Sequence, residues 1–189
     1  ITNISLFNKG IYKSTVKRFM WGSVFYFVLL FLCTAFSIMV SVDPDKELSM
    51  YRWQKGPLLY QSEFLVPSVM MAIAVPTVVA LLVYRFVHSK RQAVFAHSLP
   101  VGRNANFIST VLAAFTLMFV PVILNGLILI VLSLTKYSEF FSVSSCLVWT
   151  AVNLVGLFVM FSFASFCAMI TGNSFSLIAL NGLIHSFLL

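Results

Sequence analysis

An uninterrupted apolar stretch, MWGSVFYFVLLFLCTAFSIMV at residues 20 to 40, constrains the fold of this chain more than any other feature. Its 21 residues carry no charge, and a helix needs about 20 apolar residues to cross the hydrocarbon core of a bilayer. The whole chain has the same character, with 60% hydrophobic and 9% charged residues, whereas soluble domains carry about 25% charged residues. We therefore predict an integral membrane protein.

Apolar segments recur along the chain and predict an all-α, polytopic membrane helical bundle. We expect five spans in a transmembrane domain that covers residues 20 to 189. Their approximate bounds are 20–42, 64–87, 107–134, 144–170 and 174–189. Because the chain begins with Ile1 rather than Met and its last apolar segment reaches Leu189 without a polar flank, we expect it to be part of a longer protein.

Charged residues divide unequally between the connections that alternate along these spans. All five acids lie at residues 43 to 63 and 135 to 143, together with four basic residues. The N-terminal segment and the borders of residues 88 to 106 have eight basic residues instead: Lys9, Lys13, Lys17, Arg18, Arg85, Lys90, Arg91 and Arg103. Short loops rich in Lys and Arg stay on the cytoplasmic side. We therefore expect a multi-pass protein of the cell membrane, with its N-terminus and residues 88 to 106 in the cytoplasm.

The basic segment before the first span has an amphipathic pattern. Lysines recur every four residues along one face of a helix, and apolar residues cluster on the other face. The lysines are Lys9, Lys13 and Lys17, and the apolar residues are Ile4, Phe7 and Ile11. Helices of this kind lie along a membrane surface with their lysines toward anionic headgroups. We predict a cytoplasmic interfacial helix at residues 1 to 19; the alternative is a solvated basic tail.

Polar and helix-breaking residues occur inside the predicted spans. Asn125, Asn153 and Asn181 fall in the third, fourth and fifth spans, where asparagine either lines a polar pathway or forms a hydrogen bond between helices. Pro76 and Pro121 fall in the second and third spans, where each removes a backbone donor and favours a kink. Such a kink is either structural or a moving hinge.

Residues suited to catalysis or metal binding are scarce in the predicted spans. All five carboxylates lie outside them, so no buried acid pair is available for acid and base chemistry. A zinc site needs closely spaced histidines, and this spacing is not found among His88, His97 and His185. The cysteines resemble small hydrophobic residues; they are Cys33, Cys146 and Cys167. The string GIYKST lacks the second glycine of a phosphate-binding loop. We therefore expect no enzymatic activity, cofactor or metal in this chain.

A basic stretch with apolar residues, FAHSLPVGR at residues 95 to 103, separates the second and third spans. Pro100 disfavours helix at Leu99, so we expect Phe95 and Leu99 in a short amphipathic turn on the cytoplasmic side. Exposed apolar residues there indicate a binding partner. With its flanking spans, this stretch resembles the permease subunits of type-two ATP-binding-cassette (ABC) transporters, in particular the small bacterial permeases encoded beside a separate ATPase.

The resemblance covers the N-terminal segment, the five spans and residues 88 to 106. It implies that this connection forms a coupling helix in a groove of the nucleotide-binding subunit, and that the N-terminal segment is a connecting helix. The coupling role then falls on Phe95, His97, Ser98, Leu99, Pro100 and Arg103. The implied partners are cytoplasmic ABC ATPase subunits, which bind ATP and Mg²⁺, and a second permease chain, identical or homologous, in the lipid bilayer. No nucleic acid is expected.

Two features depart from the family pattern. Five spans are visible instead of the six usual in this family, so the resemblance implies a sixth span in the full domain. Asn-Ala-Asn at residues 104 to 106 replaces further basic residues often found after the arginine. The implied function is that of a permease, and we expect an exporter. The alternative is a non-transporting membrane sensor or assembly anchor. An intramembrane hydrolase would need catalytic residues beyond Leu189.

Overall fold

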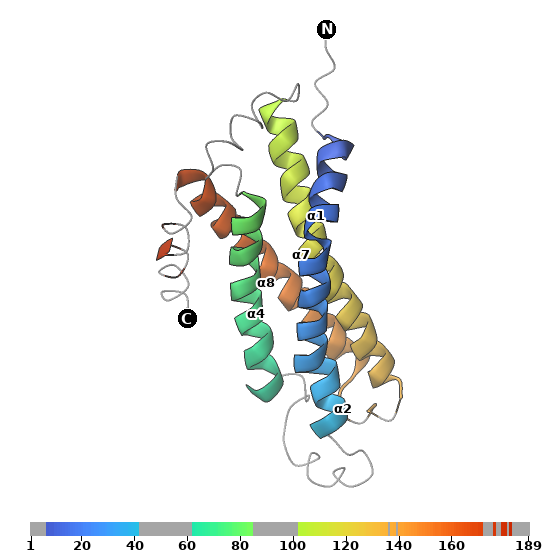
Figure 1. The fold of residues 1–189 in the computed structure, drawn as a ribbon. Coiled ribbons are helices and arrows are strands. Elements are labelled where there is room, and N and C mark those ends of the chain that lie inside the picture. Colours follow the sequence, from blue (N-terminus) through green and yellow to red (C-terminus); the bar gives the residue numbers. More distant parts are fainter. Residues whose placement is uncertain are drawn as a thin grey trace.

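Helices make up all the regular structure in the described part of the chain. The computed structural model describes residues 7–41, 62–84, 102–135, 137–138, 140–171, 176, 179–180 and 182. The helices are α1 (Lys9–Phe31), which continues through the π-helix η1 (Leu32–Phe36) into α2 (Ser37–Ser41), then α4 (Ser62–Val83), α7 (Arg103–Ser133) and α8 (Val143–Ile170). Figure 1 shows them side by side as an elongated bundle.

Four of these helical segments are long and apolar enough to cross a membrane. They are Lys9–Val40, Val66–Val83, Asn104–Ser133 and Val143–Ile170, and they correspond to the first four spans expected from the sequence. The prediction of an all-helical bundle of apolar spans is therefore confirmed for four segments. The fifth expected span, 174–189, falls almost entirely outside the described residues, so this span and the expected sixth remain predictions.

The first helix begins within the basic segment and differs from the expected separate interfacial helix. Asn8 caps it by accepting hydrogen bonds from the N–H groups of Gly10 and Ile11 at 2.9 and 3.2 Å. From there the helix runs without a break to residue 41. At 1.5 Å per residue it is about 50 Å long, well beyond the roughly 30 Å of a hydrocarbon core. Residues 9 to 19 therefore extend the first span along its own axis, and residues 1 to 6 lie outside the described part.

Contacts pair the helices in a defined way. α1 packs mainly on α7, α4 packs mainly on α8, and α7 and α8 pack on each other. Figure 1 shows that α1 and α7 start at the end of the bundle that carries the N-terminus, whereas α4 and α8 start at the opposite end. Successive long helices therefore alternate in direction, as the segments of a multi-pass protein do.

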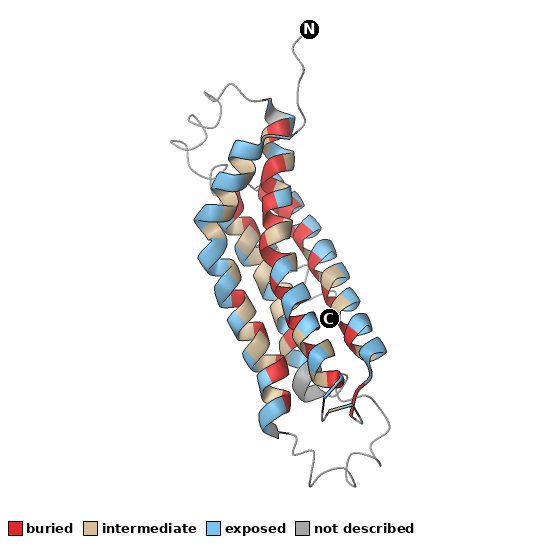
Figure 2. Ribbon diagram, turned by 90° about the vertical axis from the view of Figure 1, so that its right-hand side faces the viewer, coloured by how far each residue is buried: buried red, intermediate tan, exposed pale blue. Residues whose placement is uncertain are grey.

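Apolar residues occupy both the inside and the outside of the bundle. Figure 2 shows buried and exposed residues alternating along the same helices. Small buried residues, including Ala35, Ala80, Ala114 and Ala164, let the helix backbones approach closely. Large apolar residues lie on the outer surface, where Trp21, Val155 and Phe166 are 77%, 63% and 65% exposed. Such a surface suits lipid rather than water, which agrees with a membrane protein.

Candidate functional site

Four hydrogen bonds join α7 to α1, to its N-cap residue Asn8 and to the π-helix η1. We call this set of pairs the α1–α7 seam. The pairs are Asn8 N–H to Ser109 Oγ (2.8 Å), the Tyr12 hydroxyl with Thr116 Oγ1 (3.0 Å), Ser23 Oγ to the Leu117 carbonyl (2.8 Å), and Asn125 Nδ2 to Thr34 Oγ1 (2.7 Å). Residue numbers increase together along both helices, so α1 and α7 are parallel neighbours. The first two pairs also explain why residues 9 to 19 stay against the bundle.

The third pair of the seam supplies a hydrogen-bond donor in place of the one that Pro121 removes from α7. A proline inside a helix has no N–H, so the carbonyl four residues earlier loses its usual donor. In α7 that carbonyl belongs to Leu117, and Ser23 Oγ of α1 donates to it at 2.8 Å. Backbone carbonyls freed in apolar surroundings need such a substitute donor. The proline and the serine thus form one structural unit across two helices.

The fourth pair lies where α1 departs from regular α-helix. Thr34 is in the wide π-turn η1, and its hydroxyl donates to the Leu30 carbonyl at 2.6 Å while accepting from Asn125 Nδ2. Thr34 and Asn125 are both fully buried. π-turns inside α-helices occur frequently at functional sites. Because Asn125 follows Pro121 by one turn, irregular parts of two contacting helices meet at this level.

α8 approaches the same level through Gly126. A Cβ atom at this glycine would meet Thr150 Oγ1 and lie 3.1 Å from Thr150 Cγ2, so the two helices touch closely at this point. The Thr150 hydroxyl is held by the Cys146 carbonyl of its own helix at 2.8 Å. A larger residue at position 126 would therefore require the Thr150 side chain or the helix that carries it to shift. Three helices thus converge around Asn125.

The described residues include only part of the expected coupling stretch. Arg103 is the first residue of α7, directly after Gly102 at the N-cap position. Its side chain and the other expected coupling residues, Phe95, His97, Ser98, Leu99 and Pro100, lie outside the described part. Their role therefore remains a prediction.

The three asparagines considered for a polar path have different surroundings. Asn125 bonds across to Thr34, whereas the buried Asn153 donates from Nδ2 to the Trp149 carbonyl of its own helix at 2.8 Å. Asn181 lies outside the described residues. The interhelical hydrogen bond considered for these residues is therefore found at Asn125.

Sequence reasoning did not single out the hydroxyl groups that complete the seam: Ser23, Thr34, Ser109 and Thr116. Serine and threonine in helices commonly bond a carbonyl of their own helix, as Thr77 and Ser162 do here. The sequence indicated half of one pairing, because Pro121 leaves the Leu117 carbonyl without its usual N–H donor. The identity of the donor depended on which helix lies beside it.

The seam consists of hydroxyl, amide and backbone groups, and its pairs include no Asp, Glu, His, Lys or Arg side chain. Within the described ranges, no group of three or more His, Cys, Asp or Glu residues could hold a metal ion. The pair Thr34 and Asn125 can fix the register of two helices, or bind a polar group that reaches the same level.

No protein-family model matches the sequence, and no curated protein and no solved structure is significantly similar to the chain. The fold therefore defines the class of protein: an all-helical bundle whose described part contains four apolar helices of membrane-spanning length. A more specific function has to be argued from its own residues.

Proposed function

We propose that this chain is the permease subunit of a type-two ABC transporter, an exporter that works with a separate cytoplasmic ATPase. Its transmembrane helices would form a path with those of a second permease chain. ATP and Mg²⁺ would bind to the ATPase subunits, and this chain would convert their closure into helix movement. The proposal rests on the FAHSLPVGR stretch, on the basic residues that favour a cytoplasmic position for it, and on the arrangement of α7.

The observation that carries the proposal is the position of α7 relative to that stretch. FAHSLPVGR ends at Arg103, which is the first residue of α7. α7 is in turn joined to the first helical segment by the four hydrogen bonds of the seam. A displacement of the stretch would therefore move α7 and α1 together. Its effect would reach the level of Asn125, where the π-turn and the proline leave the helices least regular.

The side chains of the FAHSLPVGR stretch suit contact with the ATPase subunit. Phe95 and Leu99, four residues apart, can share one face of a short helix and fill an apolar groove. Arg103 lies beyond the proline and can meet acidic residues at the rim of that groove. A large apolar anchor at the centre of an interface contributes about 2 kcal/mol or more, whereas an exposed ion pair contributes about 0 to 1 kcal/mol.

The test is co-purification with the cytoplasmic ATPase encoded beside this chain, identified by a complete G-x-x-x-x-G-K-[ST] loop. Phe95→Ala combined with Leu99→Ala should weaken binding of the ATPase by roughly 30-fold or more. Arg103→Ala should weaken it by about five-fold at most, mainly at low salt. Transport-coupled ATP hydrolysis by the reconstituted complex should fall in parallel.

A matched control removes the same side chains elsewhere. Leu112 and Phe166 are exposed on α7 and α8, and Leu112→Ala with Phe166→Ala should leave the ATPase bound. A non-transporting sensor or anchor predicts instead that no ATPase co-purifies. Normal recovery and normal coupled activity of the Phe95 and Leu99 double variant would disprove the coupling role.

A further inference from the structure

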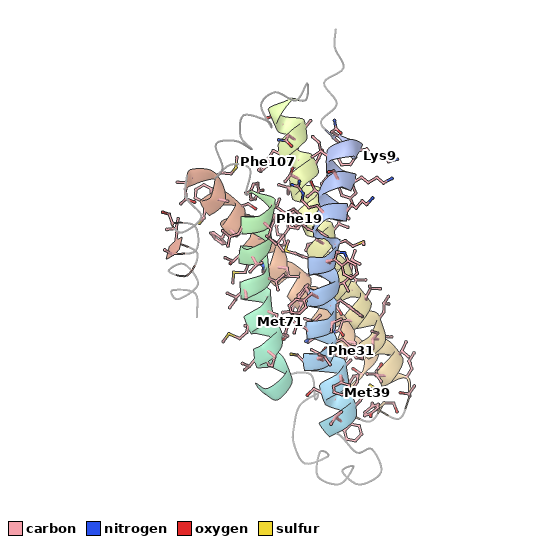
Figure 3. All side chains as sticks on the ribbon, in the orientation of Figure 1. Lys9, Phe19, Phe31, Met39, Met71 and Phe107 are labelled. Atoms are coloured by element: carbon pink, nitrogen blue, oxygen red, sulfur yellow. The ribbon has the colours of Figure 1, made fainter. Side chains whose placement is uncertain are left out.

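An apolar groove runs between α1 and α4, and Ser23 and Leu117, the third pair of the α1–α7 seam, lie along its lining. Its walls come from residues 19 to 29 of α1 and residues 71 to 83 of α4, with Leu117 of α7 at its floor, and its volume is about 230 Å³. Figure 3 labels one residue from each wall, Phe19 and Met71. Gly22 keeps the groove open, because a Cβ atom placed on it would have no neighbour within 4 Å.

The groove has the length of one leaflet rather than of a whole membrane. Residues 19 to 29 of a helix extend over about 15 Å, which is half of the roughly 30 Å hydrocarbon thickness. The groove begins directly after Arg18, the last charged residue before the apolar run of the first span. A partner helix would need a contact face across both leaflets. An acyl chain needs a contact face across one leaflet only.

Arg18 shares a helix face with residues that line the groove, and the neighbouring lysines do not. On a helix, Arg18 is one turn before Gly22 and two turns before Phe25, so these exposed residues share a face. Lys17 and Lys13 are also exposed, but at 3.6 residues per turn they lie about 100° and 140° around the helix from Arg18. Side chains of a helix lean toward its N-terminus, and long cationic side chains extend to the headgroup level. The Arg18 guanidinium is therefore suited to a phosphate group at the end of the groove.

From these observations we propose that the groove between α1 and α4 binds an anionic phospholipid. One acyl chain lies between the two helices, and Arg18 contacts the headgroup phosphate. Basic residues next to a crevice between transmembrane helices recognise acidic lipid headgroups in this way. The proposal does not depend on a transport function, because no step of it uses the stretch at residues 95 to 103.

The test measures which lipids remain bound to the purified chain. Delipidated protein is mixed with equal amounts of phosphatidylglycerol and phosphatidylcholine of identical acyl composition, and the retained lipids are counted by native mass spectrometry. The wild-type chain should retain phosphatidylglycerol in preference to phosphatidylcholine. Arg18→Gln should reduce this preference roughly five-fold, since one cation near a lipid surface accounts for about that factor. Lys17→Gln, on a different face of α1, should leave the preference unchanged.

Filling the groove tests the acyl-chain contact separately. Gly22→Leu should lower retention of both lipids severalfold, because the new side chain enters open space in the groove. Gly156→Leu on α8 is the matched control, since a Cβ atom on Gly156 would also have no neighbour within 4 Å; this variant should retain lipid like the wild type. Ala74→Leu fills the groove from the other wall and should repeat the result of Gly22→Leu.

Three outcomes would overturn the proposal. One is unchanged retention in both Gly22→Leu and Ala74→Leu. Another is an equal loss of preference in Lys17→Gln and Arg18→Gln, which would indicate a diffuse basic surface. The third is disulfide-linked dimers of Gly22→Cys in nanodiscs together with no retained lipid, which would assign the groove to a second copy of the chain.

Discussion

Asn125 has an incomplete set of hydrogen bonds in a fully buried position. Its Nδ2 donates to Thr34, but its Oδ1 has no partner among the described residues. A buried acceptor without a donor lowers the stability of the folded state. Polar residues that remain inside apolar bundles are typical of positions with a function. Asn125 is therefore the residue of the seam that we expect to matter more for activity than for stability.

Substitutions of Asn125 and of its partner Thr34 should affect the free energy of unfolding unequally. Asn125→Leu should leave the free energy of unfolding within about 1 kcal/mol of the wild type or raise it, because the whole buried amide is replaced by an apolar group of similar size. Thr34→Val should lower it by about 1 to 3 kcal/mol, because the Asn125 amide would then lack its partner. Unfolding of the purified protein by SDS in mixed micelles measures both. The double variant should recover most of the Thr34→Val loss, and a double variant as unstable as Thr34→Val would contradict this explanation.

α7 depends on α1 at the level of its internal proline. Pro121 removes the donor to the Leu117 carbonyl, and Ser23 of α1 replaces it. The two helices can therefore separate at this level only if that carbonyl gains another donor. This dependence belongs to the pair of helices, because neither helix alone contains both groups.

A double-mutant cycle measures this dependence between elements. Ser23→Ala should cost about 1 kcal/mol in the wild-type background, since hydrogen bonds between membrane helices average about 0.6 and reach about 1.7 kcal/mol. In the Pro121→Ala background the same change should cost close to nothing, because the N–H of residue 121 then serves Leu117. Ser162→Ala is the control, since the Ser162 hydroxyl bonds only its own helix in the structure. Equal costs of Ser23→Ala in the two backgrounds would show that Ser23 acts independently of the proline.

The alternating direction of the helices places the helix ends of the molecule in two groups. The start of α1, the end of α4 and the start of α7 lie at one end of the bundle, whereas the end of α2, the start of α4, the end of α7 and the start of α8 lie at the other. This grouping is the one that the charges had suggested. The arrangement of helices does not assign either end to the cytoplasm, so the orientation rests on the positive-inside rule.

Cysteine labelling in intact cells tests the orientation. In a background without Cys33, Cys146 and Cys167, an impermeant thiol reagent should label Gln54→Cys and should not reach Lys13→Cys or Gln92→Cys. Permeabilised cells serve as the control, and all three positions should react there. Labelling of Gln92→Cys from outside intact cells would reverse the orientation and remove the basis for the coupling role of residues 95 to 103.

Local properties of the sequence determined the class of protein and the positions of the first four spans. A run of apolar residues either reaches the thickness of a bilayer or does not, and this is independent of its neighbours. The start of the first helix was harder to predict from the sequence, because the pattern at residues 9 to 19 suits an interfacial helix equally well. The contacts of Asn8 and Tyr12 with α7 decided that these residues continue the first span.

Tertiary structure alone decided which helices are neighbours and how each is rotated. Lipid chains are as apolar as leucine side chains, so hydropathy gives no preference among possible helix pairs. Asn125 was a candidate from its residue type, but its pairing with Thr34, the π-turn around that threonine and the donor for Leu117 all required α1 beside α7. The groove between α1 and α4 likewise exists because α4 faces α1 over the length of one leaflet. Close packing and hydrogen bonds between helices, which depend on residues far apart in the chain, set these features.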